Sequence, residues 1–289
     1  MRPSTLLRYR ILTAAIGVPL ALGVLFYAPG DFAYAFFLVA FFWAAVEFIA
    51  MAKHFAPSAP IRGLWWMIPT ASIALYAGLN SPRWLDDSGA LGEPVAFWLV
   101  LIGGLLAVVP ACTVLFSDVD VKEGLVAVGV LTFAIPYFAL PPVALAFLHA
   151  IDPWIILWLI SIVWLGDTAA FFTGRRFGRH KLAPITSPNK SWEGACASVA
   201  IALVATAVWA HLRLGAVLPA LLLVALCTSV AAQAGDLVES MVKRGAGVKD
   251  SSNILPGHGG FFDRLDALLL AIPVFLIGCW LVGFERLVP

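Results

Sequence analysis

Long apolar stretches with few charged residues recur along the whole sequence. A helix of about 20 such residues crosses the hydrocarbon core of a bilayer, where every backbone polar group must find its partner within the protein. We therefore predict nine membrane-spanning helices, at residues 11–28, 32–51, 64–79, 95–116, 125–150, 154–173, 195–212, 218–240 and 267–284. The chain is expected to be an all-α, polytopic membrane protein.

The composition points to the same class. Hydrophobic residues make up 62% of the chain and charged residues 12%, whereas about a quarter of an ordinary soluble domain is charged. A water-soluble fold could not bury that much apolar surface. The net charge of +1 gives no sign of a nucleic-acid partner, and none is expected.

The fifth apolar stretch leaves two alternatives open. It contains Pro136, Pro141 and Pro142, and proline removes a helical hydrogen bond and crowds the preceding turn. The stretch is either one bent helix or two short segments, and the choice decides on which side of the membrane every later loop lies.

The distribution of basic residues favours one helix. With nine spans and a cytoplasmic N-terminus, only Arg83, Arg213 and Arg286 of the 18 Lys and Arg residues fall outside. Basic residues concentrate on the cytoplasmic side of membrane proteins. We predict a cytoplasmic N-terminus, an N-terminal region of about five spans at 1–150, and a C-terminal catalytic region of about four spans at 151–289 with cytoplasmic loops.

Glu47 is the unusual residue of the first half, because it lies deep in the second predicted span. An ionisable group at that depth is costly and faces a partner or a cavity in most membrane proteins. The alternative is a carboxylate at a helix end near Lys53 and His54. The sequence favours neither interpretation.

Polar residues interrupt the apolar pattern in three clusters of the second half, at 166–172, 187–194 and 233–266. In the third cluster, Gln233, Asp236, Ser240 and Lys243 recur at a spacing of three or four, which places them on one face of a helix with Glu239 beside them. Glycines allow close approach to an anion and basic residues neutralise phosphate. Asp236 and Asp263 supply hard oxygen ligands for Mg²⁺. These are the parts of a metal–phosphate site.

Simpler interpretations exist for several of these residues. Arg175, Arg176 and Arg179 fit topology determinants or contacts to anionic lipid better than catalytic groups. His258 could be a turn residue, and Arg264 and Asp266 could anchor and cap the last span.

The segment 240–266 reads SMVKRGAGVKDSSNILPGHGGFFDRLD. Over these positions it resembles the signature of the bacterial phosphatidate cytidylyltransferase family, and its length and fixed spacing make the match specific. The clusters at 166–168 and 187–194 also resemble family segments. The resemblance covers the C-terminal half of the chain.

The resemblance implies transfer of the cytidylyl group of CTP to phosphatidic acid, with CDP-diacylglycerol and pyrophosphate as products. It implies Mg²⁺ as cofactor, with a second, monovalent cation left open, and a multi-pass location in the bacterial inner membrane with the site facing the cytoplasm. The metal ligands are expected to be Asp236, Asp263 and Glu239. The catalytic residues are expected to be Asp236, Asp263, Lys243, Arg244, Lys249 and His258. Substrate binding is assigned to Asp167, Ser187, Lys190, Ser191, Glu193, Ser240, Asp250, Gly259, Gly260, Arg264 and Asp266.

Three other functions remain open from the residues alone. A CTP-dependent kinase of a membrane alcohol would release CDP and a phosphorylated alcohol. A transporter would carry flux without nucleotide turnover, and a scaffold would keep the fold without activity. A homodimer is also compatible with the sequence, which marks no interface for it.

Overall fold

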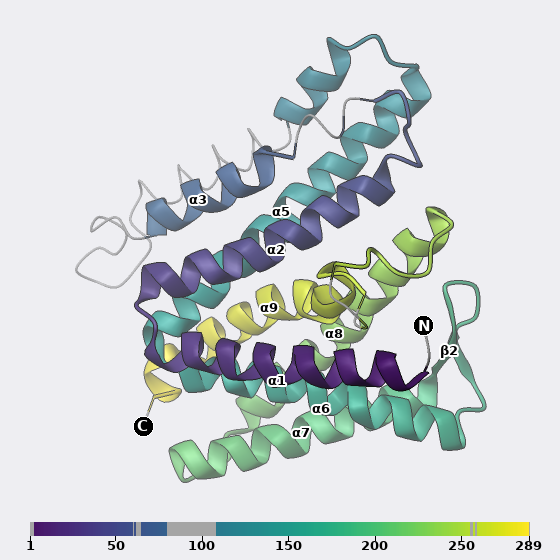
Figure 1. Ribbon diagram of the computed structural model, residues 1–289. Coiled ribbons are helices and arrows are strands. Elements are labelled where there is room, and N and C mark those ends of the chain that lie inside the picture. Colours follow the sequence, from purple (N-terminus) through teal and green to yellow (C-terminus); the bar gives the residue numbers. More distant parts are fainter. Residues whose placement is uncertain are drawn as a thin grey trace.

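The structure is a computed structural model that describes residues 3–59, 61, 65–79, 108–254, 257 and 259–288, with side chains of the first helix described from residue 15 onward. Long helices dominate it (Figure 1): α1 (Pro3–Tyr27), α2 (Gly30–Ala52), α3 (Met67–Leu79), α5 (Val121–Ile151), α6 (Pro153–Phe177), α7 (Trp192–Leu214), α8 (Pro219–Gly245) and α9 (Phe262–Val282). A short antiparallel hairpin of β1 (Lys181–Ala183) and β2 (Ser187–Ser191) joins α6 to α7, and a 3-10 turn, η2 (Phe284–Arg286), follows α9. The predicted helical class is confirmed, with the hairpin as an addition that the sequence did not indicate.

Within the described residues, six helices are long and apolar enough to cross a membrane: α2, α5, α6, α7, α8 and α9. Two shorter apolar helical segments lie at Ala15–Tyr27 and Met67–Gly78. Of the predicted span at 95–116, residues 108–115 are helical and residues 95–107 lie outside the described part. The prediction of a polytopic helical membrane protein is confirmed, while the total of nine spans stays a prediction.

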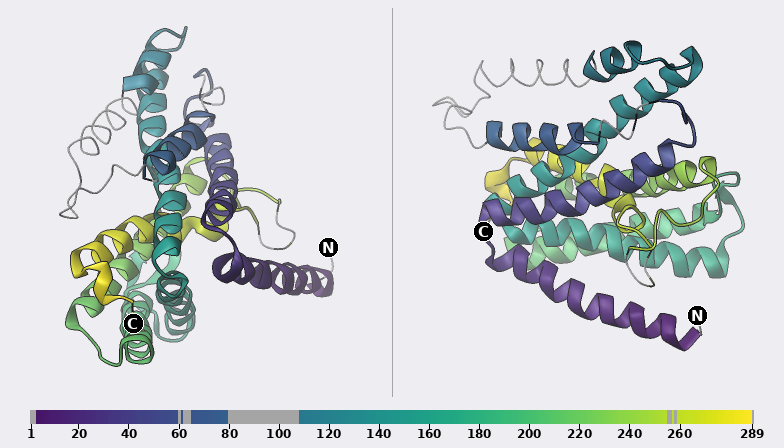
Figure 2. Two further views of the ribbon diagram at one scale, coloured as in Figure 1. Left: turned by 90° about the vertical axis from the view of Figure 1, so that its left-hand side faces the viewer. Right: turned by 45° about the horizontal axis from the view of Figure 1, so that its top comes forward.

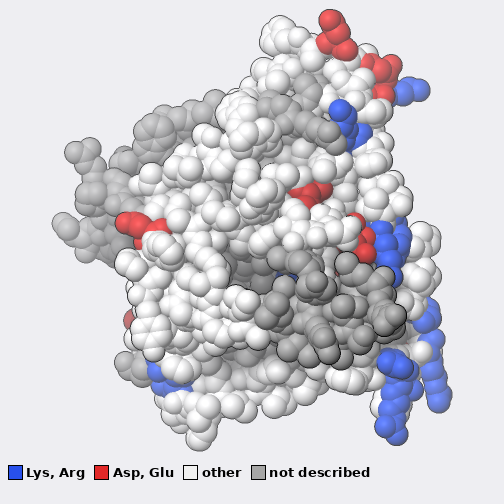
Figure 3. Space-filling view, viewed as in Figure 1, with Lys and Arg blue, Asp and Glu red and all other residues white. Residues whose placement is uncertain are grey.

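The helices run back and forth between two ends of the molecule (Figures 1 and 2). One end, which we call the loop end, holds the start of α1, the hairpin and the described residues between α8 and α9, at 246–254, 257 and 259–261. The opposite end, which we call the far end, holds the turns at 28–29, 152 and 215–218 and the chain after α9. Among Lys and Arg residues with described side chains, only Arg213 and Arg286 lie at the far end, and Figure 3 shows most of the basic surface along the loop-end edge. A cytoplasmic loop end stays a prediction.

The fifth apolar stretch forms one helix. α5 continues without a break from Val121 to Ile151 and contains all three prolines. The preceding Asp120 caps its start by accepting a hydrogen bond from the Lys122 amide at 2.9 Å. Pro141 and Pro142 are buried against neighbouring helices, and such packing stabilises a helix that has lost backbone hydrogen bonds to proline. The two-segment alternative is therefore wrong.

Packing divides the bundle into layers that meet at α9. The pairs α6/α7 and α8/α9 make the most extensive contacts, and α2 and α5 pack against one another and against α9. Near the loop end, the rings of Phe48, Phe138 and Phe262 meet at centroid distances of 5.3–5.8 Å and join α2, α5 and α9. Helix α1 projects from the side of this bundle (Figure 2).

Several helices extend beyond their predicted apolar spans toward the loop end. α6 continues to Phe177 and α8 to Gly245, while α9 begins at Phe262, before the predicted start at 267. Hydropathy places a boundary at the first polar residues, but helical hydrogen bonding continues through them. Polar side chains from 167 to 177, 233 to 245 and 262 to 266 are therefore held on rigid helices rather than on loops.

Candidate active site

A cavity of about 700 Å³ opens at the loop end between α6, the hairpin, the first turns of α7, and α8. Its apolar lining includes Ala170, Phe171 and Leu182. Its polar lining consists of Asp167, Arg175, Lys181, Asn189, Lys190, Ser191, Gln233 and Asp236. Cationic and anionic side chains thus share one concave surface beside apolar wall residues.

The hairpin places Lys190 inside this cavity. Lys190 Nζ lies 2.5 Å from Asp236 Oδ2, which ties β2 to α8. The next residue, Ser191, caps α7 by accepting a hydrogen bond from the Gly194 amide at 3.2 Å. A Cβ on Gly194 would lie 2.8 Å from the Ala170 carbonyl oxygen. The glycine therefore allows α7 to approach α6 closely enough to form the cavity wall.

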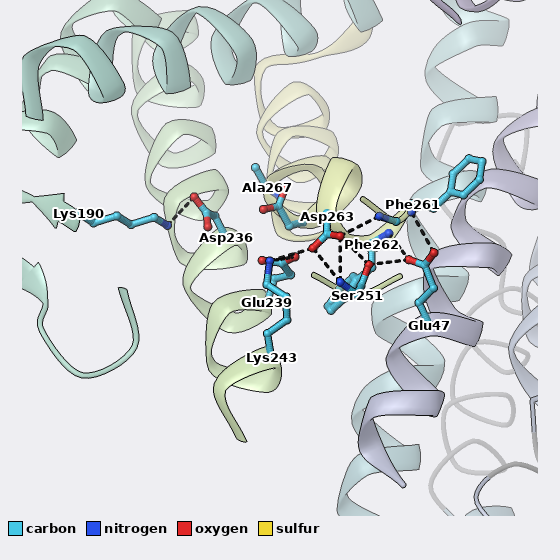
Figure 4. Close-up of polar contacts among 12 residues, drawn as sticks. Glu47, Lys190, Asp236, Glu239, Lys243, Ser251, Phe261, Phe262, Asp263 and Ala267 are labelled. Atoms are coloured by element: carbon cyan, nitrogen blue, oxygen red, sulfur yellow. Dashed lines mark hydrogen bonds and ion pairs between the residues drawn. The ribbon is translucent and has the colours of Figure 1, made fainter. Parts of the chain in front are cut away.

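A second polar group surrounds Lys243, about two turns beyond Asp236 along α8 (Figure 4). The Lys243 ammonium lies 2.6 Å from Glu239 Oε1 and 2.8 Å from Asp263 Oδ1. The side chains of Glu239 and Asp263 are only 2% and 6% exposed. An ammonium between two buried carboxylates compensates part of their desolvation and joins α8 to α9.

Asp263 receives further hydrogen bonds from the segment that precedes its helix. The Ser251 amide donates to Oδ2 at 3.0 Å, the Ser251 hydroxyl at 2.9 Å and the Gly260 amide at 2.8 Å. Gly259 has a φ of +81°, and a Cβ there would lie 2.5 Å from Asp263 Oδ2. Both glycines, which the sequence assigned to substrate binding, thus contribute to packing around Asp263, and the Gly260 N–H is already donated within the protein.

A cluster of three carboxylates lies between these two polar groups. Asp236 and Glu239 from α8 and Asp266 from α9 each offer a carboxylate oxygen, and the three oxygens lie within 4.8 Å of one another. Three hard oxygen donors at such separations suit a divalent cation such as Mg²⁺. Asp236 and Glu239 were expected as metal ligands. Asp266 was expected to bind substrate, and the structure places it with them.

Asp263 differs from these three residues, although it was also expected to bind metal. Its carboxylate already accepts hydrogen bonds from Lys243, Ser251 and Gly260. It would supply a metal ligand only if Lys243 gave up its ion pair. Metal ligation by Asp263 stays a prediction.

The other predicted site residues that the structure describes lie either in the cavity lining or outside it. Asp167, Lys190 and Ser191 line the cavity, whereas Glu193 is bonded to His180, whose ring Nδ1 lies 2.7 Å from Glu193 Oε1. Glu193 fastens the hairpin to α7. The remaining predicted residues are not part of the cavity lining: Ser187 begins β2, Ser240 lies on α8, Arg264 on α9, and Arg244, Lys249 and Asp250 are exposed in or beside the 246–261 segment. His258 lies outside the described residues.

The structure also brings in residues that the sequence did not assign to a site. Arg175 and Lys181 line the cavity, whereas Arg176 and Arg179 are exposed outside its lining. Ser251 bonds to Asp263, and Gln233 donates to the Ala195 carbonyl at 3.4 Å across the cavity wall. The basic cluster at 175–181 was visible in the sequence. Helical and hairpin geometry selects which of its members face inward.

Glu47 belongs to the same network, from the other half of the chain. Its side chain is buried and accepts hydrogen bonds from Ser251, Ser252, Phe261 and Phe262. The interpretation in which Glu47 faces a partner is therefore confirmed. The alternative, a helix-end carboxylate near Lys53 and His54, is wrong.

Comparison with known proteins gives concordant matches. The model of the Cytidylyltransferase family matches residues 8–282. A Pseudomonas aeruginosa protein named phosphatidate cytidylyltransferase is 34% identical over 310 aligned positions, which cover 96% of this chain and 99% of that protein. A protein of the same name from Brucella suis is 38% identical over 216 positions, 72% of this chain and 75% of that protein. One from Haemophilus influenzae is 41% identical over 126 positions, which cover less than half of either chain, 42% and 44%.

Proposed function

This chain belongs to the cytidylyltransferase family, and from that premise we propose that it transfers the cytidylyl group of CTP to phosphatidic acid. The products are CDP-diacylglycerol, for phospholipid biosynthesis, and pyrophosphate. The relatives that match most of the chain carry the name of this activity.

The observation that carries the proposal is the cavity of about 700 Å³ with Arg175, Lys181 and Lys190 in its lining and a carboxylate cluster at its edge. Ligand pockets of small molecules span about 300–1,000 Å³. Cations beside metal-binding carboxylates suit substrates that carry several phosphates. A transporter path would need no such pairing of a cationic pocket with a metal site.

The chemistry needs charge screening more than proton transfer. A phosphate monoester with a second pKa of about 6 is largely dianionic at neutral pH, so the lipid phosphate oxygen can attack the α-phosphorus of CTP without a protein base. The bond from that phosphorus to the bridging oxygen breaks, and pyrophosphate leaves with the electron pair. Lys190, Arg175 and Lys181 would lower the repulsion between the two anions and hold their phosphates in line.

A divalent cation fits the carboxylates of Asp236, Glu239 and Asp266. When bound, Mg²⁺ would neutralise charge on the triphosphate and on the departing pyrophosphate. Asp263 holds Lys243 at 2.8 Å beside this cluster, so its ammonium would add positive charge next to a bound metal and its phosphate ligands. A second, monovalent cation remains a proposal.

The lipid would enter from the membrane side of the cavity. Phe171 lines the cavity and Phe172 follows it, and both rings are more than half exposed on α6. Acyl chains that remain in the bilayer avoid a cost of about 0.8 kcal/mol per CH₂ exposed to water. We propose that the loop end faces the cytoplasm of a bacterial inner membrane, where CTP is available. A homodimer stays a proposal.

The test is pyrophosphate release by the purified, detergent-solubilised protein given CTP, Mg²⁺ and phosphatidic acid. We expect release to require all three and to yield CDP-diacylglycerol. Asp266→Asn should lower the rate by about 100-fold or more, because it removes a charged metal ligand. Asp118→Asn, at an exposed position before α5, is the matched control and should keep the wild-type rate.

The opposite result would redirect the assignment. Lipid-independent release, or none from a well-folded protein, would contradict the proposal. CDP together with a phosphorylated alcohol would identify a kinase instead. An unchanged rate in Asp266→Asn would remove this residue from the site even if the reaction were confirmed.

A further inference from the structure

Glu47 is a buried carboxylate without a cationic partner. It lies on α2, is 4% exposed, and forms no ion pair with any Lys, Arg or His side chain that the structure describes. A buried ionised carboxylate is costly unless it is fully hydrogen bonded. Glu47 belongs neither to the cluster of Asp236, Glu239 and Asp266 nor to the cavity lining. The proposed chemistry therefore does not use Glu47 directly.

Four donors converge on this carboxylate, two on each oxygen, and Figure 4 shows those from Ser251, Phe261 and Phe262. Oε1 accepts from the Ser252 hydroxyl at 2.5 Å and the Phe261 amide at 3.2 Å. Oε2 accepts from the Ser251 hydroxyl at 2.9 Å and the Phe262 amide at 2.8 Å. Two of the donors are amides at the start of α9, which has no side-chain cap of its own. Glu47 therefore caps α9 from a different helix.

The residues around Glu47 leave space for its carboxylate to approach the start of α9. Phe48, its neighbour on α2, packs its ring against that of Phe262 at 5.8 Å in an edge-on arrangement. Gly260 is buried, and a Cβ at this position would collide with the Ser251 hydroxyl and both carboxylate oxygens of Glu47. The glycine before the two phenylalanines is thus required by the approach of α2.

Glu47 is connected to Asp263 through one side chain. The Ser251 hydroxyl lies 2.9 Å from both Glu47 Oε2 and Asp263 Oδ2, and its single hydrogen can serve only one of them at a time. Ser251 and Gly260 also donate backbone N–H groups to Asp263. A displacement of this segment would therefore move Asp263 and the Lys243 ammonium that it holds.

We propose that Glu47 is a positioning residue of the active site, which holds Ser251, Ser252 and the start of α9 against α2 and thereby fixes Asp263 for cytidylyl transfer. The holding role is independent of the proposed function, and only the expected effect on cytidylyl transfer rests on it. It gives the N-terminal half of the chain a role in the chemistry of the C-terminal half. Apolar side chains alone can join α2 to α9, as the neighbouring rings of Phe48 and Phe262 do. A buried carboxylate at this place therefore asks for a role beyond joining the helices.

Glu47→Gln tests the proposal. The amide nitrogen of Gln cannot accept from a backbone N–H, so at least one α9 amide loses its partner while the side-chain volume is kept. Phe48→Leu is the matched control, since it weakens the same α2–α9 contact through the rings alone. Ser252→Ala, which removes one donor to Glu47, is a milder second variant in case Glu47→Gln folds poorly.

Two measurements separate positioning from folding. Amide hydrogen exchange of the whole protein in detergent should rise about tenfold at Phe261 and Phe262 in Glu47→Gln, through local opening. The turnover number should fall by about 10- to 100-fold, the scale for residues that orient metal ligands through hydrogen bonds, while KM for CTP stays near the wild-type value. The Mg²⁺ concentration for half-maximal rate should shift, because the Lys243 ammonium that Asp263 holds also contacts Glu239 of the carboxylate cluster. Phe48→Leu should lower the melting temperature without changing the Mg²⁺ requirement.

The proposal is overturned if Glu47→Gln and Ser252→Ala keep wild-type exchange and Mg²⁺ requirement, or if Phe48→Leu shifts the Mg²⁺ requirement as far as Glu47→Gln. If the wild-type protein shows no cytidylyl transfer, the proposed function fails. In that case, raised exchange at Phe261 and Phe262 in Glu47→Gln would still support the holding role, and unchanged exchange would remove it.

Discussion

Two ion pairs of similar burial lie at opposite ends of the helix bundle. At the far end, Arg213 Nη2 lies 2.7 Å from Asp152 Oδ2, and at the loop end Lys190 Nζ lies 2.5 Å from Asp236 Oδ2. The side chains are 26% and 11% exposed in the first pair and 24% and 31% in the second. Both pairs are short and partly buried, and the main difference is that Asp236 is more exposed than Asp152.

Their surroundings do distinguish them. Asp152 also caps α6 by accepting from the Trp154 amide at 2.9 Å, and the Arg213 guanidinium lies 5.2 Å from the Trp154 ring centroid. That pair fastens the start of α6 to the end of α7. The Lys190–Asp236 pair instead lines a cavity, and Asp236 has two further carboxylates within reach of one cation. Convergence of several charged groups on a cavity marks the site, whereas an ion pair alone does not.

The largest expected effect tests the loop-end pair. Lys190→Met should lower the rate of pyrophosphate release by about 100- to 1,000-fold, the scale of losing one preorganised electrostatic donor. It should also lower the melting temperature modestly, because Asp236 loses the ion pair that ties β2 to α8. Lys122→Met is the control, because Lys122 is exposed at the same end but outside the cavity lining. Equal loss in both variants would show that general positive charge matters rather than this position.

A smaller effect separates two adjacent arginines. Arg175 lines the cavity, while Arg176 lies outside its lining with its guanidinium 5.5 Å from the Phe177 ring centroid. Arg175→Gln should raise KM for CTP or phosphatidic acid by about tenfold, the scale of one hydrogen bond to a charged group. Arg176→Gln should leave both constants unchanged. Steady-state kinetics with each substrate varied would detect the difference. Equal effects of the two substitutions would indicate that both arginines act only as topology determinants.

The smallest effect on activity is expected at the far end. Asp152→Asn removes the charge that pairs with Arg213 and should lower the melting temperature, with a cost of about 1–2 kcal/mol for a partly buried pair. The rate per folded molecule should stay at the wild-type level. A large loss of rate without a loss of stability would contradict the structural role of this pair and weaken the contrast between the two ends.

The positions of the helices could be predicted largely from the sequence, and their polar ends could not. Apolar runs located each described long helix, because burial in lipid requires them. The starts of α7 and α9 were placed too late, at 195 and 267 instead of Trp192 and Phe262. Hydropathy falls at polar residues whether or not the helix continues, so it cannot report the helix end.

The types of residue in the candidate site could be predicted from the sequence, but which of these residues lie together could not. The spacing on α8 correctly placed Asp236, Glu239 and Lys243 on one helical segment. It could not show that Asp266 would join Asp236 and Glu239, because that depends on how α9 packs against α8. Similarly, Arg175 and Arg176 are equivalent in sequence, and the rotation of α6 alone decides which one lines the cavity.

The sequence by itself determined that the chain is a helical membrane protein, that its polar chemistry lies in the second half, and which family signature it carries. These properties follow from local composition and spacing, which each segment carries independently of the others. Only the tertiary structure decided that Glu47, more than 200 residues before Ser251 and Phe262, reaches the start of α9. Contacts between helices distant in sequence arise from packing around a shared core, and no local pattern in either helix specifies its partner.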